Sequence, residues 1–127
     1  PLFPATSGGA QLEVLGGPAT GGGAQGTLLL VHGSYHAAWC WQCHFIDFFC
    51  GQGYNTYAIS LRGHGKGTVE GEPKVAGTLE EHGSDVAAFA EHLYHEHGQP
   101  VVVLGHSFGG LIVQRAVTDA VSSASAA

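Results

Sequence analysis

Short apolar runs, each followed by a turn and then by a segment with helical spacing, constrain the fold of this chain more than any other feature. Residues 27–31 (TLLLV) and 101–104 (VVVL) are continuous apolar runs of strand length, and residues 54–61 alternate in polarity. Such continuous runs fit strands that are buried on both faces of a parallel sheet. A strand followed by a helix therefore occurs three times in succession. This alternation predicts an α/β domain with a mostly parallel sheet between two helical layers.

Residues 39–51, 78–96 and 108–121 have the three-and-four spacing of amphipathic helices. Thr78 and Glu81 form a capping-box pattern at the start of the second segment, which Gly98 and Pro100 end. The expected buried positions are Trp41, Phe45, Phe48 and Phe49 in the first helix, Val86, Phe89, Ala90 and Leu93 in the second, and Phe108, Leu111, Ile112, Ala116, Val117 and Val121 in the third.

The 127 residues are enough for one domain with a hydrophobic core. We place that domain at residues 27–121. Residues 1–26 are rich in glycine and alanine, and we expect a flexible segment there with a short strand near residues 10–15. Residues 122–127 contain only serine and alanine and are expected to form a flexible tail.

Charge and composition exclude several classes of partner. Four Lys and Arg residues stand against ten Asp and Glu residues, and no basic cluster is present to neutralise the phosphates of a nucleic acid. No apolar run approaches the roughly 18 residues that a membrane span needs. Three cysteines crowded at positions 40, 43 and 50 do not suit a secreted disulfide framework, so we expect an intracellular, reducing compartment such as the cytoplasm or an organelle stroma.

The segment Gly105-His106-Ser107-Phe108-Gly109 joins the last apolar run directly to the last helical segment. A nucleophilic serine must be exposed on a sharp turn, and glycines two residues to either side remove the Cβ atoms that would collide there. We therefore predict that Ser107 is a catalytic nucleophile at a strand-to-helix elbow, with Gly110 letting the helix lie close to the strand. The alternative is a turn whose serine only caps the helix.

The turn His32-Gly33-Ser34 directly follows the apolar run 27–31. Acyl transfer needs N–H donors at the position where the oxyanion forms, one after the nucleophile and one from the loop that follows an earlier strand. We therefore predict an oxyanion hole built from the backbone N–H groups of Ser34 and Phe108. Gly33 and His106 are the expected substrate-binding neighbours. An ordinary strand-ending loop is the alternative interpretation.

Together with Trp39-Cys40-Trp41 and Leu61-Arg62-Gly63-His64-Gly65, these motifs resemble the first half of the α/β-hydrolase fold over residues 26–121. The Trp-Cys-Trp segment is similar to the plant methylesterase and hydroxynitrile lyase branch. The resemblance implies a truncated three-layer α/β/α hydrolase fold and a carboxylester or related acyl substrate. It also implies Ser107 as the nucleophile, Ser34 and Phe108 as oxyanion donors, and no metal or organic cofactor. Epoxide and haloalkane chemistry fits less well, because those branches usually carry an acidic nucleophile.

The chain departs from the family pattern after Ser107. Family members continue with an acid and then a histidine, but only 20 residues follow Ser107 and all nine histidines precede the serine. Asp119 lies within the last helical segment, whereas His36 and His64 lie on loops that could approach the site. We therefore expect a nucleophile-bearing half of a longer ester hydrolase, inactive alone. The missing half or another protein chain would cover the free edge of strand 101–104.

Three other functions compete with this interpretation. Cys40 and Cys43 after an apolar strand resemble the thioredoxin arrangement, although two cysteines three apart on a helix are more typical of packing positions. Cys40, Cys43, His44 and His36 have the ligand types of a zinc site, which helical geometry opposes, and His92, His95 and His97 suit a solvated helix face. A truncated hydrolase homologue without catalysis, acting as a binding or structural subunit, is the non-enzymatic alternative.

Overall fold

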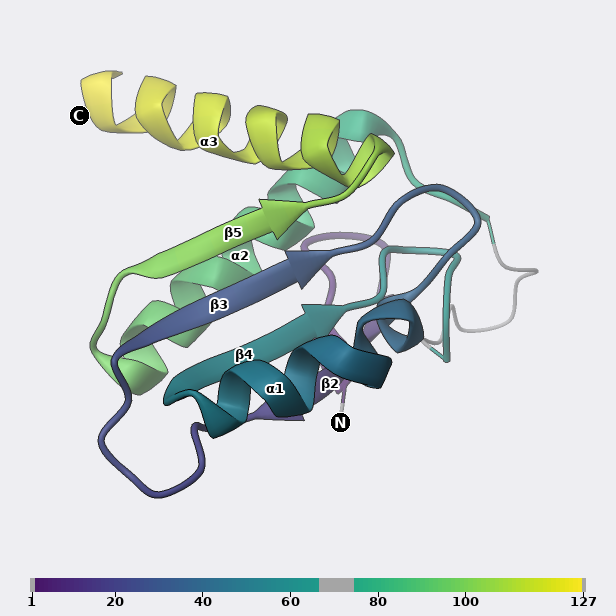
Figure 1. Ribbon diagram of the computed structural model, residues 1–127. Helices are drawn as coiled ribbons and strands as arrows, with labels where there is room; N and C mark the ends of the chain where they lie inside the picture. The colour runs from purple at the N-terminus through teal and green to yellow at the C-terminus, as the bar shows by residue number, and fades with distance from the viewer. Residues whose placement is uncertain (1, 67–74, 127) are drawn as a thin grey trace.

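The computed structural model describes residues 2–66 and 75–126, and it contains one five-stranded sheet in the order β1-β2-β4-β3-β5 (Figure 1). β3 pairs in parallel with both β4 and β5, whereas β1 and β2 add antiparallel strands at one edge. The predicted α/β fold class is therefore confirmed, with a mixed sheet in which β4, β3 and β5 are parallel. In chain order the elements are β1 (Leu2–Pro4), β2 (Gln11–Gly17), β3 (Gly26–Val31), η1 (Ala38–Trp41), η2 (Gln42–Ile46), α1 (Asp47–Gly51), β4 (Tyr54–Ile59), α2 (Leu79–His97), β5 (Val101–Gly105) and α3 (Phe108–Ala126).

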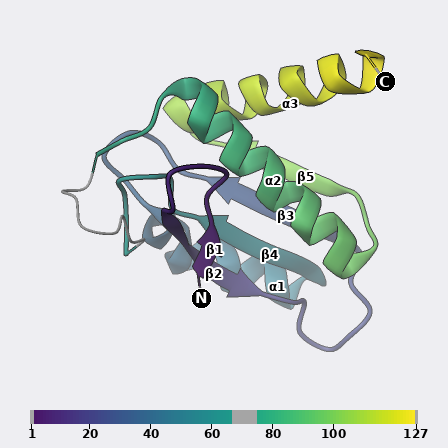
Figure 2. The same cartoon turned by 180° about the vertical axis from the view of Figure 1, so that it is seen from behind.

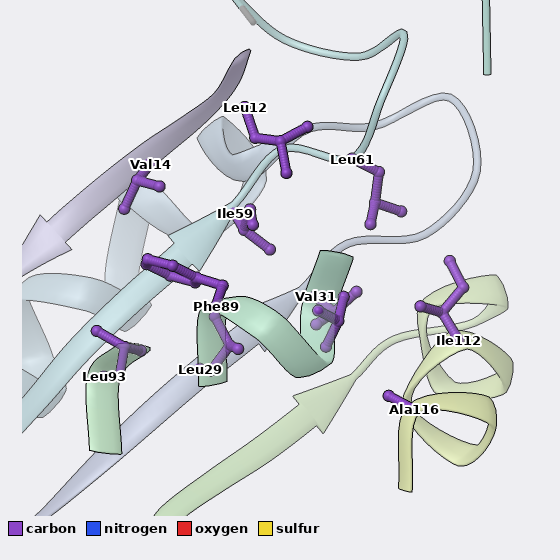
Figure 3. Close-up of a cluster of buried hydrophobic side chains, with 11 residues drawn as sticks. Leu12, Val14, Leu29, Val31, Ile59, Leu61, Phe89, Leu93, Ile112 and Ala116 are labelled. Atoms are coloured by element: carbon purple, nitrogen blue, oxygen red, sulfur yellow. The ribbon is translucent and has the colours of Figure 1, made fainter. Parts of the chain in front are cut away.

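Helices cover both faces of the sheet, which makes the predicted three layers (Figures 1 and 2). Successive side chains of a strand point to opposite faces, so Leu29 and Val31 pack with α2 and α3 while Leu30 packs beneath Trp41 on the α1 side. All three side chains are buried, as expected for a central parallel strand. Figure 3 shows the larger cluster, which gathers Leu12, Val14, Leu29, Val31, Ile59, Leu61, Val86, Phe89, Leu93, Ile112 and Ala116.

Helix α2 begins and ends where the sequence predicts. The Glu81 N–H donates to Thr78 Oγ1 at 3.1 Å, and the Thr78 N–H donates to Glu81 Oε1 at 3.0 Å, so the capping box is complete. Gly98 ends the helix in the left-handed conformation that glycine adopts without strain. Val86, Phe89 and Leu93 are buried, and Ala90 packs against the same cluster.

The amphipathic helix expected over residues 39–51 is wrong. The segment is broken at Cys43 and His44, which have extended and left-handed backbone conformations, with a φ of 71° at His44. The break shifts the buried face by one position, so that Trp41 is followed by Ile46 and Cys50 in the core. Phe45 and Phe48, which the continuous pattern would bury, are 43% and 57% exposed.

Strand β5 and helix α3 are less buried than expected. Among the strands that the structure describes, β5 lies at the edge and pairs with β3 alone. Val102 and Leu104 are 60% and 46% exposed, so the prediction of a fully buried strand is wrong. On α3 the buried side chains are Ile112 and Ala116. The side chains of β5 that point to the α1 face are exposed because α1 lies over β4 and does not reach β5 (Figure 1). The rest of the expected apolar face of α3 is also exposed, and this exposed set is Phe108, Leu111, Val117 and Val121.

Both terminal segments are more regular than their composition suggests. Residues 1–26 were expected to be flexible with one short strand, but β1 and β2 both join the sheet, and Phe3 packs on Phe89 with ring centroids 4.9 Å apart. The expected tail at 122–127 continues α3 through Ala126, since alanine favours helix and no glycine or proline follows Gly110. Among the described residues, no helix combines the length and apolar character needed to cross a bilayer.

Candidate active site

Ser107 lies in a tight turn between β5 and α3. Its φ is 56°, a left-handed conformation that side chains other than glycine rarely adopt, and the residue is exposed. Two short hydrogen bonds close the turn, from the Gly109 N–H to the His106 carbonyl and from the Gly110 N–H to the Ser107 carbonyl, both at 2.9 Å. The His106 N–H donates to the Val31 carbonyl at 3.1 Å and ties the turn to the end of β3.

Glycine is sterically required on both sides of Ser107. A Cβ atom on Gly105 would lie 2.5 Å from the Gly109 carbonyl oxygen, and one on Gly109 would lie 2.5 Å from the carbonyl oxygens of Val31 and His32. These distances are far below van der Waals contact, and the opposing atoms belong to the backbone. A Cβ on Gly110 would meet its nearest neighbour at an ordinary 3.7 Å, so the predicted packing role of Gly110 is wrong.

The loop after β3 brings Gly33 and Ser34 to the same turn. A Cβ on Gly33 would lie 3.1 Å from the Cβ of Ser107, so glycine permits this close approach. Ser34 and Phe108 line one pocket of about 270 Å³, which also includes Gly33 and Leu61. Phe108 is the first residue of α3, and the first N–H groups of a helix have no partner within it. Predicted residues 33, 34, 107 and 108 are thus assembled at one place.

His106 faces a different pocket. It lines a space of about 210 Å³ together with His36, Cys40, Trp41 and Phe45. A Cβ on Gly33 would lie 3.3 Å from His106 Nδ1, so the two predicted substrate-binding residues are neighbours that line separate pockets. The turn carrying Ser107 therefore has one pocket beside Phe108 and another beside His106.

Neither loop histidine is bonded to Ser107. The Nδ1–H of His36 donates to the Ser34 carbonyl at 3.0 Å, and the Nδ1–H of His64 donates to the Arg62 carbonyl at 2.8 Å. Within residues 2–66 and 75–126, no hydrogen bond joins the Ser107 hydroxyl to a histidine or a carboxylate. Asp119 is bonded through both oxygens to Arg115 on the same helix, so it too is engaged elsewhere.

His32 supports the Gly33 loop from inside the protein, a role that sequence reasoning missed. Its Nε2 accepts from the Leu61 N–H at 3.0 Å, and its Nδ1–H donates to the Gly33 carbonyl at 2.8 Å. The ring is fully buried, and this burial, with the positive charges of nearby histidines, lowers its pKa to about 4. His32 is therefore neutral at pH 7 and has both ring nitrogens paired.

Two buried polar residues of α2 were also missed. Asp85 binds Arg62 through both carboxylate oxygens, and His82 lines the pocket that contains Ser34 and Phe108. A sequence signal existed, because positions 82, 85, 86, 89 and 93 share one helix face, and three of them are the predicted core residues Val86, Phe89 and Leu93. Polar residues on a core-facing stripe are candidates for a paired or functional role.

The redox and zinc alternatives gain no geometric support. Cys40, Cys43 and Cys50 are all free thiols, and burial raises the pKa of Cys40, whereas a redox-active cysteine needs a lowered value. Cys43 is exposed and so is not the packing residue expected from helical spacing. In the part of the chain that the structure describes, no three His, Cys, Asp or Glu side chains are grouped to hold a metal ion. His97 bonds the Tyr57 hydroxyl at 2.9 Å, while His92 and His95 pair with glutamates.

Comparison with known proteins gives one consistent family. Residues 28–127 match the alpha/beta hydrolase family. The chain is 33% identical over 91 residues to protein phosphatase methylesterase 1 of Mus musculus and 32% identical to that of Bos taurus, covering 71% of this chain in each case. It spans only 23% of the length of these relatives.

Solved structures give the same fold. The N-formylmaleamic acid deformylase of Pseudomonas putida S16 superposes with a TM-score of 0.69 at 23% identity, over 94% of this chain and 42% of that protein. A carboxylesterase of Nitrososphaera gargenis gives 0.67 at 23% identity, over 94% and 40% of the two chains. An epoxide hydrolase of Vigna radiata gives 0.66 at 23% identity, over 88% and 31%.

Proposed function

Because this chain belongs to the alpha/beta hydrolase family, we propose that it acts as a serine hydrolase on small carboxylic esters or related acyl compounds, with Ser107 as the nucleophile. The observation that carries the proposal is the left-handed, exposed Ser107 held against Gly33, beside a pocket that Ser34 and Phe108 line together. Matched relatives are named methylesterases, and one neighbour of the same fold is a carboxylesterase, which favours ester chemistry.

The proposed reaction follows from this arrangement. The Ser107 oxygen attacks the ester carbonyl carbon, and the carbonyl oxygen takes up negative charge as its double bond opens. The N–H groups of Ser34 and Phe108 stabilise that charge, a contribution worth about 3–4 kcal/mol per donor in related sites. A base takes the proton of the Ser107 hydroxyl during the attack and gives it to the leaving oxygen, so that the tetrahedral species expels the alcohol and leaves an acyl group on Ser107. Water then attacks this acyl group and releases the acid.

The acid and base that this reaction needs are proposed to come from polypeptide beyond the described residues. Two observations support this proposal. None of the described hydrogen bonds connects Ser107 to a histidine. The chain also spans only 23% of the length of its first curated relative. Removing the base from such a site leaves only the small residual catalysis of the oxyanion hole. We therefore expect weak activity from residues 1–127 by themselves.

The free edge of β5 supports the same proposal. Val102 and Leu104 are exposed on the face that α1 does not cover, and within residues 2–66 and 75–126 β5 pairs with β3 alone. Unpaired strand edges with apolar side chains are prone to pair with other chains. We propose that a further segment of the protein, or a partner chain, covers β5. The three free cysteines further suggest that the protein works in a reducing compartment.

A non-catalytic role is the second candidate, favoured by the same lack of a described base at Ser107. The test is hydrolysis of p-nitrophenyl acetate and butyrate by the full-length protein, by its Ser107→Ala variant and by Ser122→Ala, which alters an exposed serine on α3. The hydrolase proposal expects turnover that Ser107→Ala lowers at least about a thousandfold and Ser122→Ala leaves unchanged. Equal rates for the wild type and Ser107→Ala would favour the non-catalytic role.

A further inference from the structure

His82 combines near-complete burial with an unpaired nitrogen. The side chain belongs to the first turns of α2 and is only 2% exposed. Its Nδ1 is buried with no hydrogen-bond partner, although most buried polar atoms in proteins have one. By contrast, Asp85, three residues further along the same helix, has both oxygens bonded to Arg62 and Thr6. The lack of a partner at His82 is therefore not shared by the neighbouring buried polar residue Asp85.

The position of His82 points to a ligand. His82 lines the same pocket as Ser34 and Phe108, the proposed oxyanion donors, and Leu61 and Ala76 are apolar residues of the same lining. Two other buried polar atoms in the described chain lack a partner, Trp41 Nε1 and Gln99 Oε1, and neither residue lines this pocket. Gly77 lies close to the imidazole of His82, since a Cβ atom on Gly77 would be 3.4 Å from His82 Cε1.

We propose that His82 is a specificity-determining residue, which hydrogen-bonds a hydroxyl group on the substrate that occupies this pocket. The inference rests on the proposed ester hydrolysis and narrows its substrates to small hydroxyl-bearing esters. The pocket volume of about 270 Å³ is at the small end of ligand sites, which suits a short acyl or alcohol chain.

The chemistry of the ring favours a hydroxyl over a charged group. Burial lowers the pKa of His82, and the neighbouring His64 ring, 6.3 Å away between centroids, acts in the same direction. A neutral imidazole has one donor and one acceptor nitrogen. A hydroxyl can satisfy either, whereas a carboxylate would lose its hydration beside a neutral ring.

Isosteric probes test this directly, because they differ only by a hydroxyl in place of a methyl group. One pair is 2-hydroxyethyl butyrate and propyl butyrate, and the other is ethyl 3-hydroxybutyrate and ethyl 3-methylbutyrate. Binding is measured by NMR titration of the full-length Ser107→Ala protein, which cannot consume the esters through Ser107. We expect the hydroxyl member of at least one pair to bind about tenfold more tightly, with the His82 ring nitrogen signals shifting.

Three substitutions control for loss of shape. His82→Leu removes both nitrogens, whereas His82→Asn and His82→Gln place a polar atom near Nδ1 and Nε2 respectively. We expect selectivity to fall to within twofold in His82→Leu and to persist in one of the two amide variants, among variants whose thermal melts remain cooperative. Equal binding within both pairs, no saturable binding, or selectivity that survives His82→Leu would overturn the inference. Hydroxyl selectivity in a protein whose Ser107 proves unreactive would instead leave His82 as a ligand site and remove the proposed reaction.

Discussion

Arg62 and Asp85 form a two-point salt bridge inside the protein, with Nε to Oδ2 at 2.6 Å and Nη2 to Oδ1 at 2.9 Å. The pair connects the segment after β4 to helix α2, and Asp85 also accepts from the N–H and hydroxyl of Thr6. Burial raises the pKa of Asp85, but the hydrogen bonds from Arg62 and Thr6 outweigh this effect and hold the pKa below its usual value. The interaction therefore fixes α2, and with it His82, against the loops of the candidate site.

Removing the charge of Asp85 is expected to destabilise the protein strongly. Asp85→Asn leaves the Arg62 guanidinium, whose side chain is 8% exposed, without its buried counter-charge. Loss of one member of a buried pair costs about 3–5 kcal/mol. Asp119→Asn is the matched control, because it breaks a more exposed pair with Arg115 and should cost at most about 1 kcal/mol. Urea unfolding of both variants measures the difference, and similar losses for the two would contradict this account.

Gly109 and Gly110 are adjacent but should respond oppositely to alanine. In Gly109→Ala the new methyl group meets two backbone oxygens at 2.5 Å, which cannot rotate away, so we expect a loss of about 1–3 kcal/mol or more. In Gly110→Ala the nearest atom is at 3.7 Å, and the change adds helix propensity of about 0.5–1 kcal/mol. Thermal melting of the two variants compares them, and equal destabilisation would show that the turn differs from the one described.

The conformation of Ser107 predicts a difference between two small replacements. Ser107→Ala keeps the strain of a φ of 56°, whereas Ser107→Gly relieves it. The left-handed conformation costs a residue other than glycine roughly 1–2 kcal/mol. Glycine avoids this cost, but it also gives the unfolded chain more conformational freedom, which offsets part of the increase in stability. Ser107→Gly should therefore be about 1 kcal/mol more stable than Ser107→Ala in chemical denaturation. The reverse order would mean that residue 107 is not held in a strained turn.

The low pKa of His32 predicts that stability falls in mild acid. The folded ring has a pKa of about 4 against about 6.5 when unfolded, so between these values only the unfolded state takes up the proton. The free energy of unfolding should be highest above pH 6.5 and should fall by up to about 3 kcal/mol by pH 4. The lowered pKa of His82 acts in the same direction.

The matched variant is His32→Gln, whose side-chain oxygen can still accept from the Leu61 N–H but does not titrate. Its unfolding free energy, measured at pH 7 and pH 5, should depend less on pH than that of the wild type. An unchanged slope would assign the acid sensitivity to other groups.

Local patterns predicted β2, β3, β4 and β5, the capping box of α2 and the turn at Ser107, because each depends on residues close together in sequence. They did not predict β1. The break at Cys43 and His44 was not predictable in this way, since apolar residues occur at helical spacing on either side of it. What decides the conformation there is which side chains fit against β3 and β4, and that is a tertiary effect.

The pairing of polar residues that are far apart in the chain could not be predicted from the sequence either. Arg62 and Asp85 are 23 residues apart, and neither has a sequence signature for the other. The exposure of Val102 also follows from its position on the face of β5 that α1 does not cover, and not from its own sequence, which has the pattern of a buried strand. Gly33, Ser34, Ser107 and Phe108 lie close together because they follow parallel strands, whose ends meet at one edge of the sheet. Their roles in catalysis stay predictions.

Covalent labelling with a fluorophosphonate tests the central claim, that Ser107 is a nucleophile beside two stabilising N–H groups. The full-length protein is incubated with the reagent, digested, and mapped by mass spectrometry, with the exposed serines at positions 34 and 122 as internal comparisons. The account predicts an adduct on the peptide containing Ser107, absent from Ser107→Ala and much weaker at the other serines. No adduct at Ser107, or equal modification of all three positions, would contradict it.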